Sequence, residues 1–261
     1  MTVLLQISDP HFGTEVPAVV QALADLAQEQ APQVVVWSGD ITQRSRRAQW
    51  QAASRFAARL AAAHTLAIPG NHDIALFNLA ERAIAPYASF RRSFGAELEP
   101  VLALPDLLVQ GVNTTRPWRH KHGQVSDAQI ERVARRLGDA EARQWRVIVT
   151  HQPVHVTRAE DHVNLLRGHE RAIERWAAAG ADIVLGGHIH LPFVRELATR
   201  QGRLFAVQAG TALSHRVRHG SPNSVNLLRF MAPRPSGCRI ERWDYSERVQ
   251  RFARIAQVDL G

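Results

Sequence analysis

The chain has 261 residues, 45% of them hydrophobic and 21% charged, which suits one globular domain with a sizeable buried core. It has no apolar run of the roughly 18 residues that span a bilayer, and its N-terminus lacks the basic start and small-residue cleavage site of a secretory signal. Cys238 is the only cysteine, which excludes an internal disulfide and a thiolate cluster, while the formal net charge of +8 raises the question of nucleic acid. We therefore expect a single cytoplasmic domain over residues 1–261, without a membrane span.

Short β-rich runs alternate with longer amphipathic runs along most of the chain. The runs that predict strands are 3–7, 34–37, 66–68, 107–112, 147–149 and 183–185, and those that predict helices are 16–30, 47–63, 127–137 and 168–179. After His190, the runs 193–194, 204–207 and 225–228 follow one another without helices, which indicates antiparallel strands. We expect a layered α/β protein with a mixed sheet or two packed sheets.

Five of the predicted strands end in a short polar motif. In chain order the motif residues are Asp9 and His11, then Asp40, then Asn71, His72 and Asp73, then His151, and finally His188 and His190. Ligands of open α/β sheets bind beyond the carboxyl ends of the strands. We therefore expect all five motifs to gather at one edge of the sheet.

Seven of these side chains have the chemistry of a metal centre. Two aspartates, one asparagine and four histidines offer oxygen and imidazole ligands, which suit manganese, iron or zinc. Seven ligands are too many for one tetrahedral site and suit two metals that share a carboxylate. Each residue alone also fits a structural role, as a turn residue, a helix cap or a buried histidine. Five separate strand ends that all carry chelating residues argue against that reading.

In this order, the motifs resemble those of the calcineurin-like metallophosphoesterase superfamily, with a match from residue 4 to about 191. The resemblance implies an α/β fold, a four-layer α/β/β/α sandwich of two mixed β-sheets flanked by helices. It also implies two metals with separate ligands. One metal would be held by Asp9, His11 and His190, the other by Asn71, His151 and His188, and Asp40 would bridge the two. His72 corresponds to the family histidine that stays off the metals and faces the phosphate, and Asp73 would orient its ring.

Two neighbouring cations lower the pKa of a bridging water, so that hydroxide is available near neutral pH, and they bind phosphate oxygens. We therefore expect a hydrolase of phosphate esters that uses two divalent ions, with His72 donating a hydrogen bond or a proton. Length, layout and the segment 113–137 are most similar to the bacterial cyclic-nucleotide phosphodiesterase branch. This similarity implies a small phosphodiester substrate such as a cyclic nucleotide.

Three other readings remain open: a metal-dependent nuclease, a nucleotide pyrophosphatase and a non-catalytic scaffold on the same fold. The basic charge favours the nuclease, but Lys121 is the only lysine among 32 basic residues, which indicates a general habit of using arginine. A nucleic-acid partner is therefore not favoured. A scaffold would be expected to lose a motif position such as His72, and none is missing. The oligomeric state, the segment after His190 and the roles of four polar residues also stay open; those residues are Arg44, His120, His122 and His155.

Overall fold

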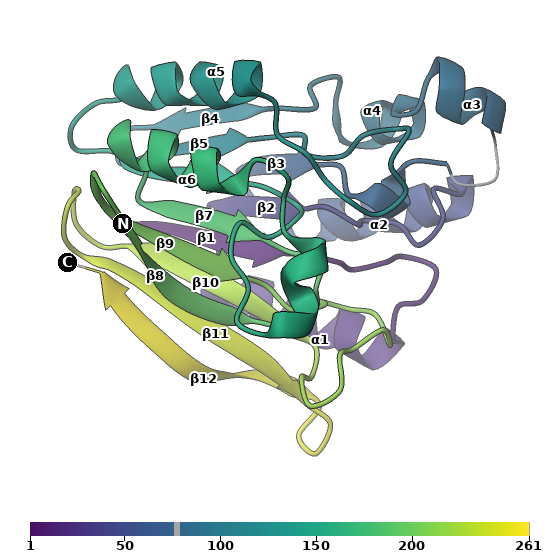
Figure 1. Cartoon of the computed structure of the whole chain (residues 1–261). Coiled ribbons are helices and arrows are strands. Elements are labelled where there is room, and N and C mark those ends of the chain that lie inside the picture. The colour runs from purple at the N-terminus through teal and green to yellow at the C-terminus, as the bar shows by residue number, and fades with distance from the viewer. Residues whose placement is uncertain (76–78, 261) are drawn as a thin grey trace.

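A computed structural model shows two six-stranded sheets packed face to face, with helices on both outer sides (Figure 1). The structure describes residues 1–75 and 79–260. The layers confirm the α/β/β/α sandwich of two mixed sheets. Among the described residues, no helix combines the length and the apolar character that crossing a bilayer requires.

The first sheet has the strand order β12-β11-β10-β1-β2-β3. Its parallel part is made of β1 (Thr2–Ile7), β2 (Val34–Ser38) and β3 (His64–Ile68). Its antiparallel part is made of β10 (Ser224–Phe230), β11 (Cys238–Ser246) and β12 (Arg251–Leu260). The helices α1 (Pro17–Gln30) and α2 (Arg47–Arg59) cover its outer face.

The second sheet has the strand order β4-β5-β6-β7-β9-β8. Its strands are β4 (Val101–Leu104), β5 (Leu107–Gly111), β6 (Trp145–Val149), β7 (Ile183–Gly186), β8 (Phe193–Thr199) and β9 (Gly202–Gln208). The helices α5 (Asp127–Gly138) and α6 (His169–Ala178) cover its outer face. Four shorter elements lie in the connections, namely η1 (Asn71–Asp73), α3 (Leu79–Ile84), α4 (Ala88–Phe94) and η2 (Ala159–Asn164).

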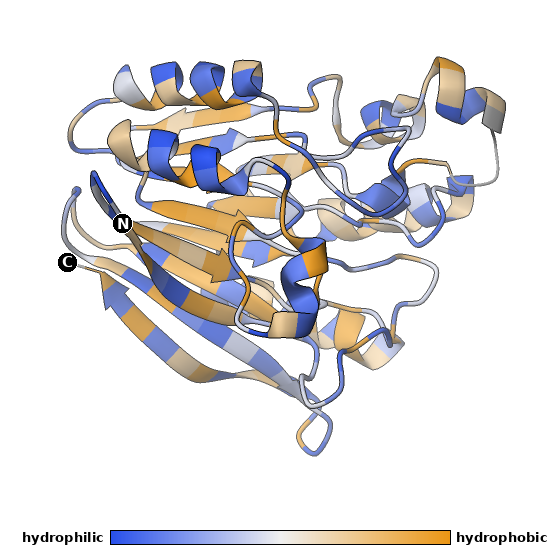
Figure 2. Cartoon of the chain, viewed as in Figure 1, coloured by the Kyte–Doolittle hydropathy of each residue, from blue (hydrophilic) through white to orange (hydrophobic). Residues whose placement is uncertain are grey.

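The inner strands are hydrophobic on both faces because each face is covered. In β1, Leu5 and Ile7 pack on the side of α1 and α2, whereas Leu4 lies in the core between the two sheets. This alternation follows from the two-residue period of a strand. Figure 2 shows the central strands as hydrophobic along their length, while the outer strand β12 alternates in character. The two sheets therefore pack on a shared apolar layer, and this packing fixes the positions of the loops at the strand ends.

Two expectations about the sheets need correction. The strands after His190 are not simply antiparallel neighbours: β8 and β9 form an antiparallel hairpin, but β9 also pairs parallel to β7, and β10 joins β1 in the other sheet. The motifs also do not lie at the edge of one sheet. Three follow β1, β2 and β3 of the first sheet and two follow β6 and β7 of the second. They meet because the aligned sheets end at the same side of the sandwich.

Candidate metal centre

Hydrogen bonds donated by backbone amides join the motif loops within and between the sheets. The amide of Asp9 donates to the carbonyl of Gly39 at 3.1 Å, and the amide of His11 donates to the carbonyl of Asp40 at 3.1 Å. Across the sheets, the amide of His188 donates to Asp9 Oδ2 at 2.9 Å. These bonds link the loops that follow three strands, β1, β2 and β7, before any ligand binds.

The local backbone at these positions is strained. Nine non-glycine residues of the described chain have positive φ, and five of them are candidate ligands with φ between 44° and 73°, namely Asp9, His11, Asp40, His188 and His190. Such conformations are costly for residues with a side chain and persist where the surroundings enforce them, often at functional sites. Their concentration here supports a functional role for the loops.

The ligand atoms form groups of metal-binding size. One group contains Asp9, His11 and His190, a second contains Asp40, His151 and His188, and in each group the ligand atoms lie within 4.8 Å of one another. Asp9 Oδ1 lies 3.2 Å from His190 Nε2, and Asp40 Oδ1 lies 3.3 Å from His151 Nε2. Asp40 Oδ2 lies 3.8 Å from His11 Nε2, so Asp40 reaches both groups.

Several buried nitrogen and oxygen atoms of these residues lack a regular hydrogen-bond partner. Within the described chain, Asn71 Oδ1 and both ring nitrogens of His188 are buried without a hydrogen bond, and Asp9 Oδ1 and His151 Nε2 contact only other candidate ligands, without normal hydrogen-bond geometry. An unpaired buried polar atom costs on the order of 1–3 kcal/mol. Divalent cations would give these lone pairs their partners, and the oxygen and imidazole donors suit manganese, iron or zinc. The residues therefore fit a metal centre.

The charges of the metal-free site also favour cations. Burial acts to raise the pKa of Asp9, but His190 and His151 outweigh it, so this pKa lies below its ordinary range. Burial acts to lower the pKa of His151, but Asp40 and Asp9 raise it to about 9. Burial and the neighbouring His151 lower the pKa of His188 to about 3. Burial also acts to raise the pKa of Asp40, but nearby histidines, His151 foremost, lower it, so Asp9 and Asp40 are ionised at neutral pH. A metal must displace a proton from His151 in order to bind it.

His72 shares a third group of metal-binding size with His11 and Asp40, but Gln43 rather than Asp73 contacts its ring. Its Nδ1 lies 2.9 Å from the carbonyl oxygen of Gln43, and its Nε2 lies 4.0 Å from Asp40 Oδ2. Asp73 does not take the orienting role expected of it. Its carboxylate accepts the amides of Ile41, Thr42 and Gly70 at 2.8–3.0 Å. Asp73 therefore fixes the backbone of two motif loops, and Gln43 orients the imidazole.

Two glycines are required by close packing around the ligands. Gly39 has a φ of +95°, and a Cβ there would lie 2.4 Å from His151 Nδ1. At Gly70 a Cβ would lie 2.1 Å from the backbone nitrogen of Asp40. Gly70 is thus needed because the loops of Asn71 and Asp40 approach closely, and not because its backbone is left-handed.

The candidate centre opens into a cavity of about 430 Å³. Four of the candidate ligands and His72 line it, together with four charged side chains, Lys121, Asp161, Arg216 and Arg218. The Nη1 of Arg216 donates to Gln43 Oε1 at 2.8 Å and lies 3.2 Å from His11 Nδ1. The sequence did not single out Gln43, which lies three residues beyond Asp40 without metal-ligand chemistry of its own. It did not single out Arg216 either, because arginine is common throughout this chain.

Of the four polar residues left open, His120 lines this cavity. The ring of His122 lies 3.1 Å from the carbonyl of Val163 and borders a different cavity, and His155 stacks edge-on against Phe193. The backbone amide of Arg44 donates to Gln49 Oε1 at 2.9 Å. His120 therefore joins the candidate site, and the charge of Arg44 acts on its ring.

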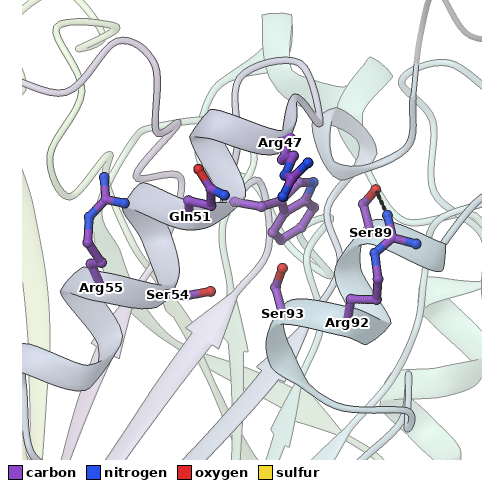
Figure 3. Close-up of a pocket in the computed structure, with 8 residues that line it drawn as sticks. Arg47, Gln51, Ser54, Arg55, Ser89, Arg92 and Ser93 are labelled. Atoms are coloured by element: carbon purple, nitrogen blue, oxygen red, sulfur yellow. Dashed lines mark hydrogen bonds between the residues drawn. The ribbon is translucent and has the colours of Figure 1, made fainter.

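A larger cavity of about 860 Å³ lies between α2 and α4 (Figure 3). Arg47, Arg55 and Arg92 point around it, and Arg92 donates to the hydroxyl of Ser89 at 2.8 Å. None of its described lining residues is a histidine or a carboxylate. This basic groove lacks ligands for a metal or a general base, so the chemistry lies in the cavity at the strand ends.

A search of curated proteins finds no match. Among solved structures, the chain is similar to a purple acid phosphatase from yellow lupin (Lupinus luteus) seeds, with 14% identity and a TM-score of 0.70 over 99% of this chain, although it spans only 53% of the lupin chain. It is also similar to a dimetal phosphatase from Danio rerio (14% identity, TM-score 0.66), covering 99% of this chain and 98% of that one. Vacuolar protein sorting 29 from Cryptosporidium parvum matches with 12% identity, a TM-score of 0.54 and coverage of 99% and 98%. At these identities the likeness shows the fold alone.

The comparison with family models shows more than the fold. Residues 2–192 match the model of the calcineurin-like phosphoesterases, a span that contains all five strand-end motifs. The clustered histidine and aspartate side chains are those of a metal-dependent phosphoesterase. The chain belongs to the calcineurin-like phosphoesterase family.

Proposed function

We propose that this protein hydrolyses small phosphodiesters at a centre of two divalent metal ions, manganese, iron or zinc. The observation that carries the proposal is the set of unpaired buried ligand atoms gathered from four strand ends. Atoms of this kind are rarely left without partners in a folded protein.

The ligand groups suggest how the ions are held. We assign Asp9, His11 and His190 to one ion, Asn71, His151 and His188 to the other, and Asp40 to both. The distances between Asp40 and the histidines of each group support this division. Two bound divalent cations would lower the pKa of a water molecule and offset negative charge on the phosphoryl oxygens.

His72 is the chain's own candidate for proton transfer. The carbonyl of Gln43 accepts a hydrogen bond from Nδ1, so Nδ1 carries a proton and Nε2 is directed to the cavity. The His72 side chain is 18% exposed, which leaves it accessible to a substrate. In the imidazolium form, in which Nε2 also carries a proton, we assign it to hydrogen bonding with the phosphoryl group or to protonation of the leaving oxygen.

His72→Ala tests this assignment. The variant should retain both metals, because His72 is outside the ligand set, but lose about 100-fold or more in kcat. Metal content measured on the same sample separates loss of the proton donor from loss of the ions. Turnover equal to that of the wild type would remove His72 from the mechanism.

The substrate is tested with metal-reconstituted protein and a matched panel. The panel compares bis-p-nitrophenyl phosphate, p-nitrophenyl phosphate, and 2′,3′- and 3′,5′-cyclic nucleotides. We expect diesters to be preferred, with cyclic nucleotides among the substrates. Preference for the monoester would overturn the phosphodiesterase assignment, and no turnover despite two bound metals would favour a scaffold.

One observation favours a second candidate, a nuclease. The groove between α2 and α4 carries Arg47, Arg55 and Arg92, and no carboxylate lies within 4.0 Å of their guanidinium groups among the described ion pairs. A polyanion would suit this groove. Hydrolysis of single-stranded DNA with an affinity that falls steeply as salt rises would establish the nuclease in place of the small-substrate enzyme.

A further inference from the structure

Lys121 is the only lysine in a chain with 32 basic residues. It lies in the connection between β5 and α5 and lines the cavity that also contains Asp40, Asn71 and His188. An ammonium group is a compact point charge on a flexible stem, unlike the planar guanidinium used elsewhere in this chain. Lys121 therefore offers the candidate site a kind of cation that occurs nowhere else in the chain.

The residue beside a candidate ligand holds the Lys121 loop in place. Gln152 follows His151 in the chain, and its Nε2 donates to the backbone carbonyl of Lys121 at 3.3 Å. Thr114, from the start of the same connection, donates its hydroxyl to Gln152 Oε1 at 2.5 Å. These bonds fix the backbone at Lys121 relative to the loop of His151, while Lys121 itself is exposed where it lines the cavity.

The cavity carries positive charge that its own acids do not balance. Asp161 is already paired with Arg218, whose Nη1 lies 2.8 Å from its Oδ2. For Lys121 and Arg216, no carboxylate within 4.0 Å occurs among the ion pairs of the described residues. Arg216 is also half-buried and fixed by Gln43 beside His11. With two divalent ions bound nearby, these two cationic side chains would favour a ligand that carries more than one anionic group.

We propose that the substrate is a phosphodiester carrying a second phosphate group, which Lys121 binds while Arg216 contacts the phosphate that is cleaved. This inference rests on the proposed function and deepens it by naming the substrate class. Guanidinium suits paired contacts to phosphoryl oxygens, and the flexible ammonium suits a phosphate whose distance from the metals varies. A cavity of about 430 Å³ is large enough for a nucleotide-sized ligand.

A matched pair of chromogenic substrates tests the proposal on the manganese-loaded protein. Thymidine 5′-(p-nitrophenyl phosphate) is compared with the same ester carrying an additional 3′-phosphate. The two release the same leaving group, so a difference in kcat/KM reports recognition of the second phosphate. We expect the wild type to prefer the 3′-phosphorylated ester by about 10-fold or more, which is the contribution of one charge-assisted hydrogen bond.

Three variants separate a local contact from overall charge. Lys121→Gln should bring the preference close to unity through KM, whereas Lys121→Arg should restore most of it. Arg200→Gln removes one positive charge at an exposed turn between β8 and β9 and should leave the preference unchanged. Equal kcat/KM for both esters in the wild type, or a preference that survives Lys121→Gln, would overturn the proposal. Hydrolysis of neither ester would instead count against the proposed function itself.

The single lysine also permits a direct binding test. An amine-selective acylating reagent can modify only Lys121 and the N-terminal amine, and peptide mass spectrometry distinguishes them. Thymidine 3′,5′-bisphosphate should protect Lys121 in the metal-loaded protein, while thymidine 5′-monophosphate protects it less. Equal modification of Lys121 with and without the bisphosphate would contradict the assignment.

Discussion

Replacement of Asp73 by alanine tests whether its carboxylate has a structural or a catalytic role. Asp73 is fully buried and accepts the backbone amides of Ile41, Thr42 and Gly70, together with the hydroxyl of Thr42. Asp73→Ala leaves three buried amide donors without an acceptor. We therefore expect the variant to lose stability and metal binding together, because the loops that present Asp40 and Asn71 lose their common support.

The size of the effect follows from the number of donors. Each unsatisfied buried donor costs about 1–3 kcal/mol, and water entering the space left by the carboxylate restores part of that. We expect the free energy of unfolding to fall by about 3–6 kcal/mol, a large share of the 5–15 kcal/mol of a typical domain. Asp73→Asn should also destabilise, because its amide NH2 group would face backbone donors.

Urea denaturation of metal-free protein measures this loss without a contribution from bound ions. The matched control is Asp25→Ala, an exposed carboxylate on α1 that accepts a hydrogen bond from Gln21 at 2.7 Å. Its substitution should change stability by less than about 0.5 kcal/mol. If Asp73→Ala unfolds like this control but loses turnover, then Asp73 acts in the chemistry and the structural reading is refuted.

Two further outcomes test the packing and the metals. Gly70→Ala should abolish stoichiometric metal uptake, because the new Cβ would lie 2.1 Å from the backbone nitrogen of Asp40. In the control Gly138→Ala the new Cβ meets no atom within 4 Å, so this variant should bind metal normally. Equal metal content in both variants would refute the close approach. Chelation of the wild type should abolish turnover and lower Tm by several degrees, both reversed by manganese, since ions that bind only the folded state stabilise it by about 3–4 kcal/mol at 100–1,000 times Kd. A chelated protein with full activity would contradict a metal-dependent reaction.

The sequence predicted the central strands and the strand-end residues well, for a local reason. Buried parallel strands require apolar runs such as Val34–Ser38, and polar residues just after them mark where the chain leaves the core. The motif order then indicated the family, which the match over residues 2–192 confirms. The ligand set and the single-domain organisation stay predictions.

Long-range pairing was not predictable from local patterns. The strand β10 (Ser224–Phe230) reads like its neighbours in sequence, yet it crosses to the first sheet and pairs with β1, more than 200 residues earlier. The strands β11 and β12 were not predicted, and much of β12 is exposed, so its hydrophobic pattern is weak. The short helices α3 and α4 were missed because six or seven residues show too little helical periodicity.

The roles of Gln43, Arg216 and Asp73 needed the three-dimensional structure. Gln43 is distinguished only by the contacts of its carbonyl with His72 and of its side chain with Arg216. Asp73 sits in the same motif as His72, which suggested a contact between them, but the tight turn of η1 directs its carboxylate to backbone amides instead. Spacing along the chain cannot distinguish these alternatives.

The two-metal centre is tested most directly by counting metal ions per chain. Metal-free protein is loaded with manganese or zinc, desalted and analysed by elemental mass spectrometry, in parallel with Asp40→Ala. We expect two ions per chain in the wild type and a clear loss in the variant, because the Asp40 carboxylate lies within reach of both ligand groups. A wild type that takes up no stoichiometric metal, or an Asp40→Ala variant that still holds two ions, would contradict the account.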